Sequence, residues 1–236
     1  MLKAELYKMR KNRIFYICAL TVILPAIFII YKDTVLATPP DQISEWIQSV
    51  NVITSLFLTI ASGFVITFLI QREYEDKSII NVLLAPISRR VFLISKLLIW
   101  LLWYILVLGI SMAIYMLGGK LVYSGRFHTD EVMLLLNRVA TTSMLSFITS
   151  TPLVFIAVKQ RKTFYPSIMF SLIITGIELS AMTIPVKFGS LIPWSAAMLL
   201  GYGINGVYTI NLIIAIATAA IFGILGGCIT FQRQNQ

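Results

Sequence analysis

The chain has 236 residues, of which 58% are hydrophobic and only 12% charged, and its mean hydropathy is +0.87. A soluble domain would carry about twice that share of charged residues, so the composition excludes an ordinary soluble protein and places the chain in a membrane. A net charge of +9 would favour nucleic acid as the partner of a soluble protein. Here the positions of the charges explain it better, and no nucleic-acid partner is expected.

The N-terminal segment, residues 1–13, predicts a short helix that lies on the inner surface of the membrane. Leu2, Leu6 and Met9 fall on one helical face, and basic residues occupy much of the rest of the segment. A disordered basic tail is the alternative interpretation.

Six apolar stretches follow, and each is long enough to cross a bilayer as a helix. They lie at roughly 14–31, 50–70, 97–118, 132–158, 164–184 and 208–231. The fourth is the weakest, because it carries Asn137, Arg138 and seven hydroxyl residues between positions 141 and 151. We expect an all-α integral membrane fold with six transmembrane helices in a single domain over residues 1–236. Between the first two stretches, Trp46 suits the outer interface.

The connection between the second and third stretches is the most informative part of the chain. Charged residues crowd the segment from Gln71 to Ser78, and an amphipathic pattern follows. Its apolar positions share one helical face: Ile79, Ile80, Leu83, Leu84 and Ile87. Ser78 is suited to cap this helix, and Pro86 ends or bends it before Ser88 and Arg89. The alternative is an amphipathic loop that rests on lipid without a protein partner.

Lysine and arginine are distributed unevenly between the two sides of the membrane. The N-terminal segment, the second and fourth connections and the C-terminal tail hold 14 of them, and the opposite side holds five. By the positive-inside rule this places both termini in the cytoplasm of a multi-pass plasma-membrane protein. Anionic lipid is a secondary partner of the same basic residues.

Residues 185–207 interrupt the apolar pattern with prolines and glycines. The piece from Leu191 to Leu200 contains Trp194 and is too short to cross the bilayer. We expect a short re-entrant or interfacial helix on the outer side, before the sixth span.

Two features inside the spans are candidates for polar or close contacts. Glu178 is the only carboxylate deep within a span, so it needs a partner, a proton or a water-filled cavity. It either contacts a substrate or proton, or makes a structural hydrogen bond, and Arg138 is its nearest candidate partner by depth. In the sixth span Ala219, Gly223 and Gly227 lie four residues apart, which favours close helix packing within the bundle or across a dimer.

The usual residues of catalysis are missing from the sequence. His128 is the single histidine, and with two cysteines in apolar stretches it does not complete a common zinc site. Gly118-Gly119-Lys120 lacks the first glycine and the hydroxyl residue of a phosphate-binding loop. We therefore expect no catalytic residue, no metal and no cofactor in this chain, and an intramembrane enzyme is the least favoured hypothesis.

The connection from Glu73 to Arg89 resembles the first cytoplasmic loop of ABC-2-type permeases. The similarity rests on Glu73-Tyr74-Glu75-Asp76-Lys77-Ser78, on Leu83-Leu84-Ala85-Pro86-Ile87-Ser88-Arg89 and on Lys96 before the third span. In that family the segment is the coupling helix, which docks on the ATP-binding subunit. Lys77-Ser78 stands where the family often has Gly-Thr. The chain length and Ile192-Pro193-Trp194-Ser195 resemble the subgroup associated with bacitracin and lantibiotic self-immunity.

The resemblance implies a non-catalytic permease subunit of an ATP-driven exporter. Such a subunit pairs with itself or with a sister permease and binds two ATPase subunits, which hold ATP and magnesium. The implied coupling residues are Glu73, Ser78, Ile79, Ile80, Leu83, Leu84, Pro86, Ser88 and Arg89. The implied substrate is amphipathic: an antimicrobial peptide, an antibiotic or a lipid. The main alternative is an ion-coupled secondary transporter that uses Glu178, although no inverted repeat is found.

Overall fold

The computed structural model describes residues 2–75, 89–160, 163–203 and 209–233, and within these ranges it contains helices and no strands. Five of the described helices are long and apolar enough to cross a membrane: Arg13–Leu36, Ile43–Glu73, Val91–Val122, Thr129–Lys159 and Thr209–Thr230. A sixth apolar helix, Tyr165–Ser180, has 16 residues. The chain is therefore an all-helical integral membrane protein.

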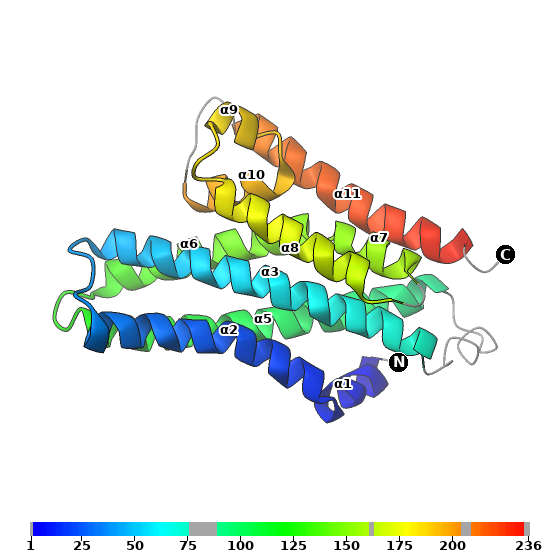
Figure 1. Cartoon of the computed structure of the whole chain (residues 1–236), viewed down its shortest axis with the longest axis horizontal. Helices are drawn as coiled ribbons and strands as arrows, with labels where there is room; N and C mark the ends of the chain where they lie inside the picture. The colour runs from blue at the N-terminus through cyan, green and yellow to red at the C-terminus, as the bar shows by residue number, and fades with distance from the viewer. Residues whose placement is uncertain (1, 76–88, 161–162, 204–208, 234–236) are drawn as a thin grey trace.

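The helices run side by side as an elongated bundle (Figure 1). In chain order they are α1 (Leu2–Lys11), α2 (Arg13–Tyr31), the π-helical turn η1 (Lys32–Leu36), α3 (Ile43–Glu75), α5 (Arg89–Val122), α6 (Thr129–Thr149), α7 (Pro152–Lys159), α8 (Tyr165–Ser180), α9 (Val186–Gly189), α10 (Pro193–Gly201) and α11 (Thr209–Arg233). Both chain termini lie at the same end of the bundle, together with α1 and the residues that border segment 76–88. We call this the basic end, and the other the distal end.

Helix α3 is central to the packing, because it contacts α2, α5, α6, α7 and α8. Its 33 residues and the 34 of α5 extend beyond the expected second and third spans. Gly63 allows the closest approach in this region: a Cβ at this position would lie 2.4 Å from Ser171 Cβ on α8. The core of the protein therefore forms around α3.

The expected fourth span is divided into α6 and α7 at Ser150 and Thr151. Pro152 has no amide hydrogen to continue the helical ladder. The carbonyl of Thr149 at the end of α6 instead accepts a hydrogen bond from Trp194 Nε1 on α10, at 2.8 Å. The expected span over 132–158 falls within the candidate span Thr129–Lys159, in which α6 and α7 meet at a break beside α10.

The short helix α10 lies close to the expected piece at 191–200 and is buried in the bundle. Ser195, Ala196 and Ala197 are fully buried, and α10 packs on α6, α8 and α11. A Cβ at Gly201 would lie 1.9 Å from Thr142 Oγ1, so this glycine permits the contact between α10 and α6. Trp194 thus contacts the break between α6 and α7.

The small residues of α11 lie against α7. A Cβ at Gly223 would approach the carbonyl carbon of Thr151 to 2.3 Å, and one at Gly227 would lie 3.1 Å from Val154. The backbone carbonyl of Ala219 accepts a hydrogen bond from Thr151 Oγ1 at 3.3 Å. All three residues therefore face the second half of the divided span.

An aromatic cluster fixes the distal end. Trp46 is fully buried, donates from Nε1 to Asp33 Oδ2 at 3.1 Å, and packs edge-on against Tyr123 and Phe127. The Tyr123 hydroxyl donates to the Pro40 carbonyl at 2.8 Å. Burial, with the Asp33 carboxylate nearby, raises the pKa of Tyr123 to about 12, so this hydroxyl stays a donor at neutral pH. Trp46 is therefore packed inside the protein with Asp33 as its partner, and its depth at the outer interface stays a prediction.

Candidate functional site

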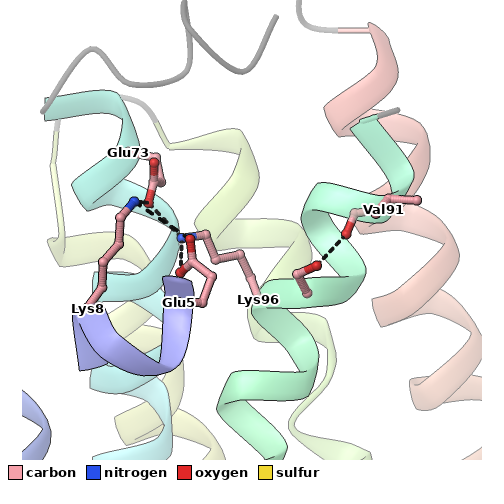
Figure 2. A network of polar contacts seen from close by, with 6 residues as sticks. Glu5, Lys8, Glu73, Val91 and Lys96 are labelled. Carbon is pink, nitrogen blue, oxygen red and sulfur yellow. Dashed lines mark hydrogen bonds and ion pairs between the residues drawn. The ribbon is translucent and has the colours of Figure 1, made fainter. Parts of the chain in front are cut away.

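A buried ion cluster lies at the basic end, where the chain enters and leaves segment 76–88. Lys96 Nζ is 2.6 Å from Glu5 Oε2 and 2.7 Å from Glu73 Oε1 (Figure 2). Lys8 completes the cluster from its exposed side, with Nζ 3.1 Å from Glu73 Oε1 and 3.7 Å from Glu5 Oε1. Two carboxylates and two ammonium groups therefore balance one another in charge.

Burial sets this cluster apart from an ordinary surface ion pair. Lys96 is 1% exposed, Glu73 2% and Glu5 6%. Buried charges are stable only when they are paired with good geometry and their hydrogen bonds are satisfied. Lys96 also lies over the Phe92 ring, with Nζ 5.2 Å from its centroid. Removing one of these buried charges should therefore lower the free energy of unfolding more than removing a single contact at the surface.

The cluster joins three elements that are far apart in the sequence. Glu5 belongs to α1, Glu73 to the last turn of α3, and Lys96 lies near the start of α5. The helices on either side of segment 76–88, α3 and α5, are thus held to each other and to α1. A movement of that segment would act directly on α3 and α5.

Most of the predicted coupling residues lie outside the described residues. These are Ser78, Ile79, Ile80, Leu83, Leu84, Pro86 and Ser88. Arg89 begins α5, and Glu73 lies in the ion cluster. Sequence reasoning missed Lys8 as a partner of Glu73 and Glu5 as a partner of Lys96. The available signal was that Glu5 falls between Leu2 and Met9, next to the apolar face of α1.

A stripe of polar side chains runs along α3 and faces its neighbours inside the bundle. Asn51, Ser55, Thr59 and Ser62 follow one another at intervals of three or four residues, which places them on one helical face. Their partners form a ladder across three helices: Asn51 with Thr142 (2.9 Å), Ser55 with Ser146 (3.0 Å), Thr59 with Glu178 (3.3 Å) and Ser62 with Trp100 (2.9 Å). The bundle interior is therefore polar over much of its length.

Glu178, on α8, contacts this stripe through Thr59 and is almost completely buried. Thr59 Oγ1 donates to its Oε1, and its other carboxyl oxygen has no hydrogen-bond partner. The expected pairing with Arg138 is wrong, since these two described residues form no ion pair. Arg138 Nη1 donates instead to the carbonyl of Tyr202 at the end of α10. The sequence placed Arg138 and Glu178 at a similar depth in the membrane. The end of α10, however, provides a backbone carbonyl as the acceptor for Arg138.

The described residues contain no group of three or more histidine, cysteine or acidic residues that could hold a metal ion. The arrangement offers a clamp at the basic end and a buried polar stripe. The clamp, which is the ion cluster, suits the transmission of movement between helices. The polar stripe suits contact with polar groups inside a membrane.

Comparison with known proteins agrees with this arrangement. The model of the ABC-2 family transporter proteins matches residues 1–178. The bacitracin transport permease protein BCRB of Bacillus licheniformis is 26% identical over 168 residues, which cover 70% of this chain and 78% of that protein. This similarity is consistent with the bacitracin permease subgroup. No solved structure matches the chain. Because the family model covers most of the sequence, the chain belongs to the ABC-2 transporter family and is a transmembrane permease subunit.

Proposed function

We propose that this chain is the membrane subunit of an ATP-driven exporter in the plasma membrane, coupled to a separate ATPase through segment 76–88. The observation that carries the proposal is the buried contact of Lys96 with Glu73 and Glu5, which holds α3 and α5, the helices on either side of that segment, to each other and to α1. ATP and magnesium bind to the ATPase subunits, and this chain is not catalytic. Closure of the ATPase dimer moves segment 76–88, and the ion cluster carries the movement into the helices.

The proposed membrane arrangement has six crossings and both termini in the cytoplasm. The sixth crossing is α8, whose 16 residues span about 24 Å, against about 30 Å of hydrocarbon. The residues that follow, with α9 and the re-entrant α10, complete its outer end. Helix α1 lies on the inner leaflet, with Arg10 and Lys11 toward anionic lipid and Lys8 in the ion cluster.

The proposed substrate is an amphipathic antimicrobial peptide, an antibiotic or a lipid, and the complex includes a second permease copy or a sister permease. The support is the similarity to a protein described as a bacitracin transport permease. Glu178 and the polar stripe of α3 lie along the path of the substrate or support the helices beside it.

The coupling is tested by changing the two leucines of the segment. In the double variant Leu83→Asp, Leu84→Asp, two charges would enter an apolar groove without partners, at a cost of several kcal/mol. We expect the variant to insert in the membrane and to lose the proposed ATPase subunit in a pull-down. The matched control is Val35→Asp, Leu36→Asp, which changes two exposed apolar residues at the distal end and should retain the ATPase. Unchanged pull-down and transport in the leucine variant would contradict the coupling assignment.

The second candidate function is ion-coupled transport, and the buried carboxyl of Glu178 is the observation that favours it. In proteoliposomes without any ATPase subunit, this hypothesis requires transport driven by a pH gradient alone and its loss in Glu178→Gln. The ABC proposal requires the opposite: no gradient-driven transport, and ATP-dependent transport that Glu178→Gln leaves in place.

A further inference from the structure

Two adjoining cavities open at the distal end, away from the ion cluster. Their volumes are about 140 and 330 Å³, and Gln48, Arg138 and Tyr202 line both. Ser44 and Asn51 add polar groups to the smaller cavity. The walls of the larger cavity are apolar beyond the shared residues: Ala181, Met182, Ile184, Val186 and Leu199. The combined space, which we call the distal pocket, therefore has a polar end and an apolar end.

The polar end carries an uncompensated positive charge. Arg138 donates to the Tyr202 carbonyl, but among the described residues it forms no ion pair with a carboxylate. Residues 204–208, which follow this loop in the sequence, contain no acidic residue. Gly203, at a φ of 74° that favours glycine, lies against the guanidinium. A guanidinium has five N–H donors, so most of them remain for a ligand.

Two buried polar atoms, on residues that line the pocket, have no hydrogen-bond partner among the described residues. They are the hydroxyl of Tyr202 and Oδ1 of Asn51, and the two residues are only 9% and 1% exposed. A buried polar group without a hydrogen bond is costly, so a ligand that supplies one is favoured. The Tyr202 hydroxyl and Arg138 can both donate to one oxyanion, and Asn51 Oδ1 can accept from a hydroxyl group.

The depth of the pocket matches the level of lipid phosphates. Leu58 is the midpoint of the candidate span Ile43–Glu73, and Gln48 lies about 15 Å from it along the helix. Half the hydrocarbon thickness of a bilayer is also about 15 Å. The polar end therefore lies at the boundary of the hydrocarbon core, and the apolar end is suited to an acyl chain.

We propose that the distal pocket binds the phosphate head group of a membrane lipid. Arg138, Tyr202 and Gln48 contact the phosphate, and one acyl chain lies along Met182, Ile184 and Leu199. This site requires neither the ATPase nor the ion cluster, so it can be tested on the permease alone. Its failure would leave the proposed coupling unaffected.

The test measures binding of short-chain lipids to the full-length chain in detergent by native mass spectrometry. The probe is dioctanoyl phosphatidic acid, compared with dioctanoylglycerol, inorganic phosphate and decanoate. We expect the phosphatidic acid to bind one per chain and at least ten-fold more tightly than each of the others. Equal binding of dioctanoylglycerol would show that the phosphate does not contribute to binding, which contradicts the proposal. Equal binding of decanoate would show that the site accepts any anionic amphiphile and does not recognise a lipid phosphate. Equal binding of inorganic phosphate would show a site for the free ion.

Three variants locate the binding. Tyr202→Phe removes the unpartnered hydroxyl and keeps the carbonyl that Arg138 contacts, and Gln48→Ala changes an exposed side chain. Each should weaken binding of phosphatidic acid at least three-fold without a change in the unfolding temperature of the lipid-free protein. Arg138→Gln should weaken it at least ten-fold. The matched control, Lys120→Gln, removes an exposed positive charge at the same end outside the pocket and should bind as the wild type does. Wild-type affinity in Tyr202→Phe and Gln48→Ala together would overturn the proposal.

Discussion

At the scale of single residues, the protein buries charge only where another charged or polar group meets it. Lys96 is surrounded by Glu5 and Glu73, and Asp33 accepts from Trp46 and contacts Lys32 at 2.9 Å. Such pairs contribute little net stability when complete, because desolvation offsets most of the attraction. Their importance is that the loss of one member leaves the other charges buried and uncompensated.

Replacing Lys96 by Met should therefore destabilise the protein strongly. The substitution keeps a long apolar stem but leaves the two buried carboxylates with only the half-exposed Lys8 as a charged partner, and we expect a loss of about 3–5 kcal/mol in the free energy of unfolding. Unfolding in mixed micelles by titration with sodium dodecyl sulfate measures this. The control is Lys8→Met, in which an exposed member of the same cluster is removed at a cost of less than about 1 kcal/mol.

A second step separates charge from packing in that result. Adding Glu5→Gln and Glu73→Gln to Lys96→Met removes the stranded carboxylates and should restore most of the stability. If the triple variant is no more stable than Lys96→Met alone, packing and not charge explains the loss.

At the scale of secondary-structure elements, close contact between helices depends on a few glycines. Gly223 on α11 lies against the break between α6 and α7, where a side chain would meet backbone atoms. Backbone cannot move aside as the end of a flexible side chain can. The contact of α11 with α7 therefore has little tolerance for added volume.

We expect Gly223→Ala to destabilise the protein by about 1–3 kcal/mol, because its Cβ would lie 2.3 Å from the carbonyl carbon of Thr151. The matched control is Gly109→Ala on α5, where the new Cβ meets nothing within 4 Å. Alanine there should be stabilising by about 0.5–1 kcal/mol, because glycine weakens a helix interior. Thermal unfolding of both variants in the same detergent measures the difference. Equal effects of the two substitutions would show that the α7–α11 contact is looser than described.

The sequence was sufficient to predict helices and their order, because long apolar stretches have few alternatives in a membrane. It also placed α10 correctly as a short helix before the last span. It did not predict the break at Ser150 and Thr151, although Pro152 was visible, because prolines are tolerated within membrane helices when another group satisfies the freed carbonyl. Here Thr151 Oγ1 donates to the carbonyl of Ile148, which Pro152 leaves without its usual donor. Trp194 donates to the carbonyl of Thr149, 45 residues away in the sequence.

The candidate site was only partly predictable for a similar reason. Glu73 and Lys96 were identified from a motif, but Glu5, the second carboxylate that contacts Lys96, is 91 residues from it and belongs to a helix expected to contact lipid. The pairing of Arg138 with Glu178 was predicted only from their similar depth in the membrane. Depth gives no information on which face of a helix a residue occupies, and the position of α10 decided the partner of Arg138.

At the scale of the whole molecule, the two ends of the bundle differ in charge and in chemistry. The basic end holds the ion cluster and both termini, and the distal end holds the aromatic cluster and the distal pocket. This asymmetry agrees with an orientation in which the basic end faces the cytoplasm.

A labelling scan in intact cells tests that orientation. In a variant without Cys18 and Cys228, single cysteines at Thr38 and Arg126 should react with a membrane-impermeant maleimide added from outside. Cysteines placed between residues 72 and 90 should react only after the cells are opened. Reaction of the 72–90 positions in intact cells would reverse the proposed topology.

The ion cluster also has a consequence for the order in which the protein is made. Glu5 leaves the ribosome before its partner Lys96, which follows 91 residues later. Until α5 has been synthesised, the carboxylates of Glu5 and Glu73 have no Lys96 to contact and must remain in water at the membrane surface. The N-terminal helix can therefore settle into its final position only after the third long helix has entered the bilayer. A chain truncated before Lys96 would retain these two acids in the open, where quality-control proteases could distinguish it from the finished protein.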